Sequence, residues 1–372
     1  MHDFVALTIA ETYRETKDAL SVRFAIPDAI QPIFRFRPGQ HLTIAAALEG
    51  AEIRRTYSIC SGSDDPTLTI TIKRVPDGLF SNWAFDTLKA GMTLNVMPPA
   101  GRFLLPRMQG DRAHFLAIAV GAGITPIMAM ADHAMRRHTQ TRFTLIYGNS
   151  DLDSIIFRER LEDLKDAHLD RFTLVHVLSR NQESDSPLLE GRITPDTMQA
   201  FAGHLFDVSD IDDAFLCGPG TMIRDLRNAL IDAGLSGERI HHEFFAPAGA
   251  TTLPPPDVIN QHSNARPQGQ APAISAADTS ASEIVAVIDG VRHRFSTRPE
   301  EVVIDAALRA GVRVPYACKG GMCSTCRARV IDGRATMRVN YSLEPWELEK
   351  GFILTCQAIP ETARLVLDFD AM

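Results

Sequence analysis

The pattern of hydrophobic and polar positions changes character near residue 110. Before that point, apolar and polar residues alternate in short runs, as in 20–26, 41–44 and 68–73. A two-residue period is typical of strands that bury one face and expose the other. Residues 1–108 are therefore predicted to form a small antiparallel β-barrel.

From residue 109 onward, the pattern predicts strands that alternate with helices. Continuous apolar runs at 115–120, 143–147, 172–178 and 214–216 are separated by stretches with the period of amphipathic helices. This alternation indicates an α/β domain with a parallel sheet of the nucleotide-binding type, here residues 109–246.

A third part is set apart by its composition. Residues 247–282 contain a run of three prolines, then mostly small and polar residues without an apolar period, which predicts a flexible linker. Beyond it, 284–288 and 291–296 flank Asp289-Gly290, a strong signal for a β-hairpin. A helix is predicted over 303–310, ending at Gly311.

Four cysteines in this last part carry the clearest chemical signal. Cys318-x4-Cys323-x2-Cys326 is followed, after 29 intervening residues, by Cys356, which is the spacing of a plant-type [2Fe-2S] site. Gly320-Gly321 would let the backbone wrap closely around such a cluster. Structural zinc is the alternative, but zinc sites usually pair two short Cys-x2-Cys arms. Residues 283–372 are accordingly predicted to form an α+β, ferredoxin-like (β-grasp) domain.

Composition and charge restrict the function classes. Hydrophobic residues make up 45% of the 372 positions and charged residues 23%, as in soluble globular proteins. The longest apolar stretch, 115–131, is too short and too rich in turn residues to span a bilayer, and no secretory signal is visible. We therefore expect a cytoplasmic protein, with Cys60 and Cys217 as reduced thiols, and no membrane partner.

The net charge of −8 is not spread evenly along the chain. Residues 283–372 hold 12 basic and 12 acidic residues, so the acidity lies upstream of the cluster domain. A moderately acidic chain without a basic patch is not expected to bind nucleic acid. Docking of the cluster domain to a redox partner cannot depend on one large negative field.

A strand of the predicted barrel carries a possible flavin motif. Along it, Arg55, Tyr57 and Ile59 share one face, and Thr56 and Ser58 the other. Alone, this could be an ordinary half-buried strand. Together with the cysteine spacing, it resembles the flavin motif of the ferredoxin-NADP reductase superfamily. The resemblance implies that FAD, rather than FMN, is bound by 55–58, with Arg55 on the flavin phosphates, Tyr57 on the isoalloxazine ring and Ser58 near its N5 atom.

A second turn in the barrel also resembles this superfamily. Gly78-Leu79-Phe80-Ser81-Asn82 corresponds to a phosphate-binding turn at the start of a short helix. Backbone N–H groups and the Ser81 hydroxyl would then donate to the flavin phosphates. The alternative is a plain helix cap at Ser81.

The nucleotide domain contains a turn suited to pyrophosphate. Gly121-Ala122-Gly123-Ile124-Thr125-Pro126 follows an apolar strand and opens a helix, with Thr125 expected to cap it and Pro126 to occupy its first position. Such a turn brings phosphate to a helix amino terminus. It lacks the full Gly-x-Gly-x-x-Gly fingerprint, so a purely structural turn is the alternative.

Further residues of the hydride-transfer site are implied by the resemblance. Cys217-Gly218-Pro219, at the end of another strand, matches the segment where the superfamily has a cysteine that faces the nicotinamide. Cys217 would shape this site and not act as a nucleophile. Phe245 would lie beside the flavin, and Glu243 near the reacting ring. Both could instead be plain strand residues.

The choice of donor rests on a few residues. Ser179-Arg180 resembles the pair that grips the 2′-phosphate of NADP in related reductases, which favours NADPH. Asp151 adds a negative charge near the expected phosphate. The alternative interpretation of Arg180 is a loop arginine that is simply exposed to solvent. NADH therefore stays an alternative.

The order of flavin, nucleotide and ferredoxin domains resembles the family of reductase components of bacterial phenylacetyl-CoA epoxidases. Segments such as 36–42, 145–149 and 340–345 carry this resemblance. It implies electron transfer from NADPH through FAD and the cluster to a di-iron oxygenase, the flavin converting a two-electron hydride into single electrons. A reductase for a steroid or aromatic-ring hydroxylase is the alternative, and a redox sensor a more distant one. The linker is predicted to let the cluster domain alternate between flavin and acceptor.

Overall fold

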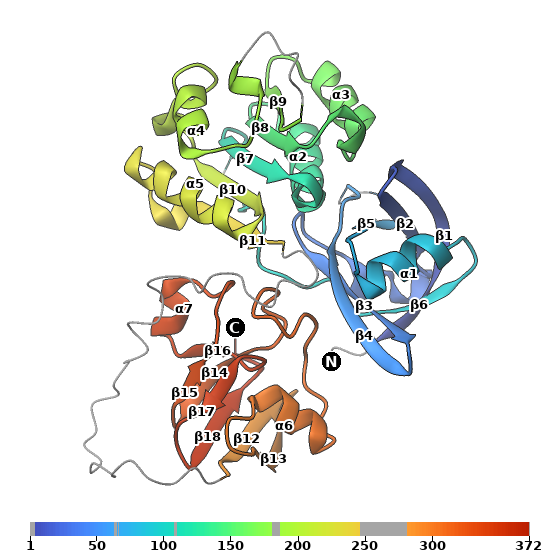
Figure 1. Cartoon of the computed structure of the whole chain (residues 1–372), viewed down its shortest axis with the longest axis vertical. Helices are drawn as coiled ribbons and strands as arrows, with labels where there is room; N and C mark the ends of the chain where they lie inside the picture. The colour runs from blue at the N-terminus through green and yellow to red at the C-terminus, as the bar shows by residue number, and fades with distance from the viewer. Residues whose placement is uncertain are drawn as a thin grey trace. The chain divides into compact units, whose positions relative to one another are not determined.

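The computed structural model describes residues 4–62, 65, 67–107, 110–180, 187–245 and 281–371. These residues belong to two compact units, 4–245 and 281–371, whose elements are labelled in Figure 1. Nearly all of the predicted linker, 247–282, lies outside the described residues. No helix within the described ranges is long and apolar enough to cross a membrane.

The first unit begins with a six-stranded antiparallel sheet in the order β4-β3-β6-β1-β2-β5. Ile59 pairs with Ile70 in an antiparallel bridge, which joins the two outer strands and closes a barrel. Phe24, Ile44 and Phe80 are among the buried side chains that fill it. The predicted antiparallel barrel is confirmed. Its elements are β1 (Val5–Thr16), β2 (Ala19–Ala25), β3 (His41–Leu48), β4 (Ala51–Ser58), β5 (Leu68–Lys73), α1 (Leu79–Thr87) and β6 (Thr93–Val96).

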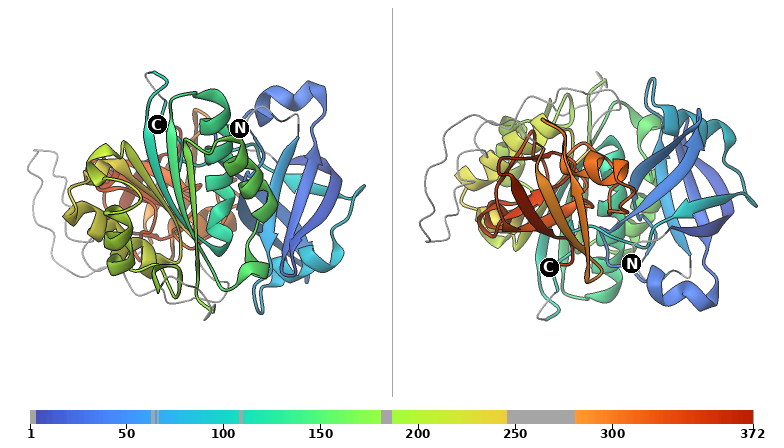
Figure 2. Two further views of the ribbon diagram at one scale, coloured as in Figure 1. Left: turned by 90° about the horizontal axis from the view of Figure 1, so that it is seen from above. Right: turned by 90° about the horizontal axis from the view of Figure 1, so that it is seen from below.

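The rest of this unit is built on a five-stranded parallel sheet in the order β11-β10-β7-β8-β9. Helices lie on both of its sides (Figure 2), with Leu161 of α3 in one core and Leu226 of α5 in the other. The predicted parallel sheet is confirmed. Its elements are β7 (His114–Val120), α2 (Ile124–Arg137), β8 (Arg142–Asn149), α3 (Arg158–Ala167), β9 (Phe172–Leu178), α4 (Pro195–Ala202), β10 (Asp213–Gly218), α5 (Gly220–Asp232) and β11 (Ile240–Phe244).

The strand order reverses between β7 and β10, which is where a ligand is expected to bind. β7 comes first in the chain, and its two neighbours in the sheet, β8 and β10, follow it in opposite directions. In open parallel sheets, ligands bind at the carboxyl ends of strands where the order reverses in this way. The turns that begin at Gly121 and at Gly218 leave β7 and β10 at this point.

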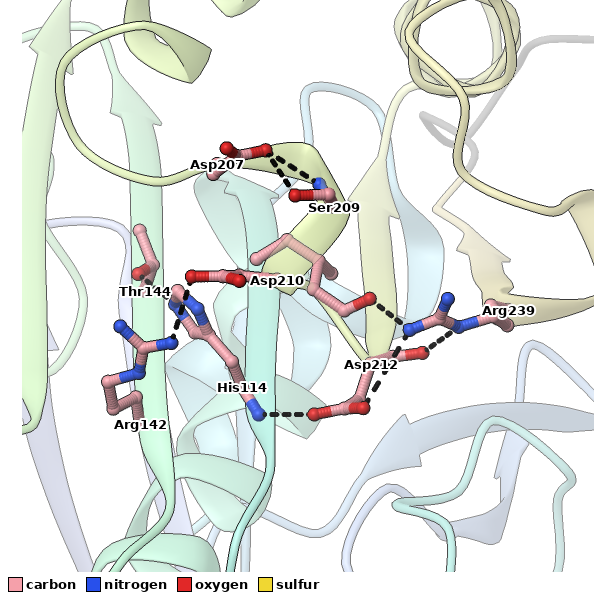
Figure 3. A network of polar contacts seen from close by, with 9 residues as sticks. His114, Arg142, Thr144, Asp207, Ser209, Asp210, Asp212 and Arg239 are labelled. Atoms are coloured by element: carbon pink, nitrogen blue, oxygen red, sulfur yellow. Dashed lines mark hydrogen bonds and ion pairs between the residues drawn. The ribbon is translucent and has the colours of Figure 1, made fainter.

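The amino ends of the same strands are tied together by polar contacts (Figure 3). The backbone N–H of His114 donates to the Asp212 carboxylate at 2.8 Å, and Arg142 pairs with Asp210 at 3.4 Å. Arg239 donates to the Asp212 carbonyl and pairs with its carboxylate at 3.8 Å. These contacts fix the starts of β7, β8 and β10, opposite to the edge at which ligands are expected.

The second unit has a five-stranded mixed sheet in the order β13-β12-β18-β14-β16. The turn Asp289-Gly290 has positive φ at both residues, 50° and 73°, which confirms the predicted hairpin. The predicted helix is confirmed as α6, and the fold is the expected α+β type. Its elements are β12 (Glu283–Ile288), β13 (Val291–Ser296), α6 (Val303–Arg309), β14 (Arg327–Asp332), β15 (Ala335–Met337), α7 (Pro345–Glu349), β16 (Phe352–Leu354), β17 (Ala358–Pro360) and β18 (Arg364–Asp368).

Candidate functional site

The four cysteines of the second unit converge as two pairs. All four are free thiols. The Cys323 thiol lies within hydrogen-bonding range of Cys318 and lowers its pKa, and the Cys326 thiol does the same for Cys356. Within the described ranges, no three His, Cys, Asp or Glu side chains surround one metal-ion position. A plant-type cluster has two irons, each bound by two cysteines, and two pairs of thiols fit this arrangement.

The backbone of the cysteine loop is shaped for an anionic group. Gly320 donates its N–H to Cys318 Sγ at 3.3 Å, and Gln357 Nε2 lies 3.7 Å from Cys356 Sγ. Gly321 has a φ of +75°, and a Cβ there would lie 3.2 Å from Val339. Donors aimed at the sulfurs favour their thiolate forms and would stabilise a bound cluster. The donor set therefore fits a [2Fe-2S] group.

The segment that follows β15 holds this loop in place. The backbone N–H of Tyr341 and the hydroxyl of Ser342 both donate to the Gly321 carbonyl, at 3.1 and 3.3 Å. Asn340 Oδ1 accepts the N–H groups of Ser342 and Leu343 at 3.2 and 2.8 Å, which keeps the segment in a tight turn. The sequence marked 340–345 only as a point of resemblance. In the structure, hydrogen bonds from this segment hold the cysteine loop in position.

In the first unit, Ser58 and Glu243 come together from different sheets. The Ser58 hydroxyl donates to Glu243 Oε2 at 3.4 Å, and Glu243 lies opposite Cys217 in the pairing of β10 with β11. His41 Nδ1 is 3.9 Å from Glu243 Oε1, and His41 pairs with Ser58 in the β3–β4 register. Three of these four residues were expected from the sequence. His41 was missed, and only the register of β3 with β4 could have indicated it.

Burial controls the protonation of this group. It raises the pKa of the Glu243 carboxyl to about 7, while the Ser58 hydrogen bond acts in the opposite direction. Burial also lowers the pKa of His41 to about 4. The pKa of the Cys217 thiol is raised, mainly by burial and to a smaller extent by the charge of Glu243. At neutral pH, His41 and Cys217 are uncharged and Glu243 is close to half-ionised. His41 Nε2 is buried without a partner among the described residues, as expected beside a bound group.

The turn after β7 lies directly against the end of β10. A Cβ on Gly123 would be 2.2 Å from the Cys217 carbonyl oxygen, so a side chain there would force the two turns apart. Gly121 has a φ of +54°, and its carbonyl accepts the Tyr147 hydroxyl at 3.0 Å. Phe245 closes the same region by donating its N–H to the Gly218 carbonyl at 3.0 Å. The turns after β7 and β10 therefore approach each other through backbone atoms.

The expected helix start in this turn needs a correction. α2 begins at Ile124, so Thr125 and Pro126 are its second and third residues and Gly123 occupies the cap position. The Thr125 hydroxyl donates to the Ala122 carbonyl at 3.0 Å instead of capping the helix. The prediction of a Thr125 cap with Pro126 at the first position was wrong. The short 3-10 turn over Gly121–Gly123 runs straight into α2 and moves its start upstream. After β10, Pro219 has a helix-compatible φ of −64° just before α5.

The flavin motif residues lie along β4 and become more buried toward its end. Ser58 is buried, Thr56 and Tyr57 are half-buried, and Arg55 is exposed with its guanidinium bonded to the Arg54 carbonyl at 2.8 Å. The Tyr57 ring lies 5.7 Å from that of Phe80. An exposed arginine beside a partly covered aromatic ring suits a flavin with its phosphates toward solvent.

The second phosphate turn differs in detail from the expectation. Ser81 is the third residue of α1, and its buried hydroxyl donates to the Gly78 carbonyl and accepts the Val75 N–H, both at 3.2 Å. The plain cap at Ser81 is therefore wrong, since Gly78 occupies the cap position and α1 has no side-chain cap. The uncapped amino terminus leaves backbone N–H groups as donors for phosphate.

The loops after β8 and β9 are joined by backbone hydrogen bonds. Ser179 donates its N–H to Asn149 and Arg180 donates to Ser150, at 2.9 and 2.8 Å. Both side chains of Ser179 and Arg180 are exposed, and Asp151 follows Ser150 directly. A cation and an anion therefore stand close together at the carboxyl edge of the sheet.

Comparisons with known proteins match the whole chain. Three family models fit: the oxidoreductase FAD-binding domain over 6–104, the oxidoreductase NAD-binding domain over 117–228 and the 2Fe-2S iron-sulfur cluster binding domain over 286–361. The chain is 39% identical over 371 residues to a subunit of 1,2-phenylacetyl-CoA epoxidase from Escherichia coli (strain K12), covering 100% of this chain and 99% of that protein.

Two further similar proteins carry the names of other oxygenase systems. The ferredoxin reductase component of 3-ketosteroid-9-alpha-monooxygenase from Rhodococcus rhodochrous is 33% identical over 370 residues, which cover 98% of this chain and 97% of that protein. Phthalate dioxygenase reductase has the same fold, with a TM-score of 0.55, 22% identity and 98% of each chain covered.

Proposed function

Because the chain belongs to the family of oxygenase reductase components that includes this protein of 1,2-phenylacetyl-CoA epoxidase, we propose that it passes electrons from NADPH to the di-iron oxygenase of a phenylacetyl-CoA epoxidase. The observation that carries this proposal is the 39% identity over the full length of both chains. Electron transfer to an oxygenase, with FAD-binding, NAD-binding and 2Fe-2S domains, is common to the family. The acceptor, the donor and the residue roles are our proposal.

The residues between β7 and β10 would receive the nicotinamide ring. Gly123 has no side chain, and a Cβ on it would lie 2.2 Å from the Cys217 carbonyl oxygen. Cys217 is an uncharged thiol at neutral pH because its pKa is raised, so it would pack against the ring without reacting. The absence of a side chain at Gly123 would help a planar ring to approach the flavin closely.

Ser58 and Glu243 would control the proton at the reacting end of the flavin. The Ser58 hydroxyl, fixed by Glu243 at 3.4 Å, would bond near N5. With a pKa of about 7, Glu243 can both accept and release a proton at neutral pH. Bound FAD would supply the conversion of a two-electron hydride into the single electrons that a [2Fe-2S] cluster carries.

The cofactor phosphates would lie on exposed donors around this centre. We assign Arg55 and the amino terminus of α1 at Gly78 to the flavin phosphates. The turn over 121–126 would hold the pyrophosphate of the nucleotide. Arg180 would bind the 2′-phosphate, and this assignment supports NADPH over NADH.

Reconstitution tests the acceptor. The purified protein, combined with phenylacetyl-CoA epoxidase oxygenase subunits, phenylacetyl-CoA and NADPH, should form epoxide in step with NADPH oxidation. A 3-ketosteroid 9α-hydroxylase oxygenase with its substrate forms the comparison arm, because the second relative names that acceptor. Product only in the steroid arm would overturn the epoxidase proposal and leave the reductase assignment intact.

A cluster-free variant serves as the control. Cys326→Ser removes one proposed iron ligand, so it should still reduce ferricyanide from NADPH but form no epoxide. Epoxide formation at the wild-type rate by this variant would contradict the proposed path through the cluster.

A further inference from the structure

An ion pair lies directly beside one of the cluster cysteines. Arg327 follows Cys326 in the chain, and its Nη1 is 2.9 Å from Oε1 of Glu347 in α7. The Glu347 side chain is 1% exposed and the Arg327 side chain 16%, so water screens this pair only weakly. Neither residue is part of the cysteine spacing or of any motif singled out in the sequence.

The pair joins four parts of the second unit. The Arg327 guanidinium lies 4.1 Å from the centroid of the Phe352 ring in β16, and its Nη2 donates to the Ala371 carbonyl at 3.3 Å. The second oxygen of Glu347 accepts the Glu344 N–H at 3.0 Å at the start of α7. The guanidinium of Arg327, a residue of β14, therefore contacts α7, β16 and the residues after β18.

The same region fixes the backbone on both sides of the Cys326–Cys356 pair. The Cys326 carbonyl accepts the N–H and the hydroxyl of Thr355 at 3.1 and 2.8 Å, and Thr355 is the residue before Cys356. Arg327 anchors the other side of Cys326. One cysteine pair is thus clamped by Thr355 and by the ion pair together.

Stability alone does not account for charges at this position. A buried ion pair is often no more stabilising than apolar side chains of the same volume, because both charges lose their hydration. A cluster, however, gains a negative charge each time it is reduced, and its potential depends on nearby net charge and hydrogen bonds. A balanced pair acts on the cluster only as a dipole, whereas either partner alone would act as a full charge.

We propose that Arg327 and Glu347 form a positioning pair for the cluster: they clamp the Cys326 arm and, by cancelling each other's charge, set the reduction potential of the [2Fe-2S] centre. The inference rests on the cluster assignment of the second unit. It does not depend on which oxygenase is the acceptor. The two partners act through Cys326 and through their field, and neither is itself an iron ligand.

The test compares cluster potentials of charge variants in the full-length holoprotein, by EPR-monitored redox titration. Glu347→Gln leaves the Arg327 charge unbalanced and should raise the potential, because a nearby cation stabilises the reduced cluster. Arg327→Gln removes the cation, so the cluster potential should fall or stay level and should not rise. The double variant restores neutrality and should return toward the wild-type value. Loosened packing alone would move both single variants in the same direction.

Matched controls separate charge from structure. Glu349→Gln removes the same charge from an exposed residue of the same helix and should shift the potential less, because solvent screens it. Glu347→Asp keeps the charge and should keep the potential. Bleaching of the flavin by NADPH checks that residues 4–245 are folded in every variant.

Cluster retention gives a second readout. Faster loss of the visible cluster bands to an iron chelator in Glu347→Gln than in Glu347→Asp supports the clamp, even where the cluster is too labile to titrate. An unchanged potential and an unchanged rate of loss in Glu347→Gln would overturn the proposal, as would equal shifts of the same sign in both single variants. A wild-type protein without any [2Fe-2S] signal would instead refute the cluster assignment itself.

Discussion

Glu243 is the residue at which the two halves of the first unit meet chemically. It belongs to β11 of the parallel sheet, yet its carboxyl bonds to Ser58 of the barrel and lies 3.9 Å from His41. The proposed site for hydride transfer therefore forms only when both halves are folded and packed. This single carboxyl makes the site sensitive to pH.

The buried carboxyl should give the first unit a measurable dependence of stability on pH. Its pKa rises from 4.5 in the unfolded chain to about 7 in the folded state. Below pH 4.5 both states are protonated; between 4.5 and 7 only the folded state keeps the proton. Stability contributed by this group is thus full at low pH and is lost as pH rises through 7, by about 3 kcal/mol.

Glu243→Gln removes this dependence. Thermal unfolding at pH 5 and pH 8 should show a smaller fall in Tm for the variant than for the wild type. Glu238→Gln, an exposed carboxyl five residues upstream, should behave like the wild type. Equal pH dependence in all three proteins would show that Glu243 is not the group responsible.

Arg180 should decide between the two donors. If it binds the 2′-phosphate, Arg180→Gln raises the KM for NADPH about 10- to 100-fold and leaves the KM for NADH unchanged, since a charge-assisted bond is worth about 1.5–3 kcal/mol. Steady-state ferricyanide reduction with each donor measures this. Arg112→Gln, an exposed arginine just before β7 at the opposite edge of the sheet, is the control. An equal loss with both donors would contradict the assignment.

Among the elements, the turn between β7 and α2 is tightly constrained by its packing against the end of β10. Gly123→Ala would place a Cβ 2.2 Å from the Cys217 carbonyl oxygen, so the end of β10 must move. We expect a loss of about 1–3 kcal/mol in stability and a slower bleaching of the flavin by NADPH in stopped flow. Gly203→Ala has its nearest neighbour at 3.9 Å and should change neither. Wild-type bleaching in Gly123→Ala would mean that this contact does not shape the nucleotide site.

The helix starts show where sequence rules stop being sufficient at this scale. Both α1 and α2 begin earlier than the serine or threonine that a capping rule selects, at Leu79 and at Ile124. In each case the hydroxyl, of Ser81 or Thr125, bonds to a carbonyl of the preceding turn. Gly78 and Gly123 take the cap positions. A Cβ on Gly78 would lie 2.5 Å from the Ser81 hydroxyl oxygen, and one on Gly123 would lie 2.2 Å from the Cys217 carbonyl oxygen. The approach of Cys217 to Gly123 is not visible in the local sequence.

At the scale of the whole molecule, the two compact units should work independently up to the flavin. Residues 4–245 and 281–371 each have their own hydrophobic core. A fragment ending at residue 246 should bind FAD and reduce ferricyanide from NADPH at close to the full-length rate. It should give no EPR signal from a [2Fe-2S] cluster and should support no oxygenase turnover. Loss of flavin from the fragment, with flavin retained by the full chain, would show that the second unit is needed to hold it.

The domain order and the chemistry of the parts could be predicted from the amino-acid sequence alone. Alternating patterns identified the barrel and the parallel sheet, and the spacing of Cys318, Cys323, Cys326 and Cys356 identified a two-iron site, because these signals depend only on neighbours along the chain. Which groups come into contact was not predictable in this way and is seen in the folded structure. The pairing of thiols, the contact of Glu243 with Ser58 and His41, and the clamp of Arg327 by Glu347 depend on strand order, register and close packing between distant segments. No local pattern encodes these, since the same strand sequences could be paired in other orders with other partners.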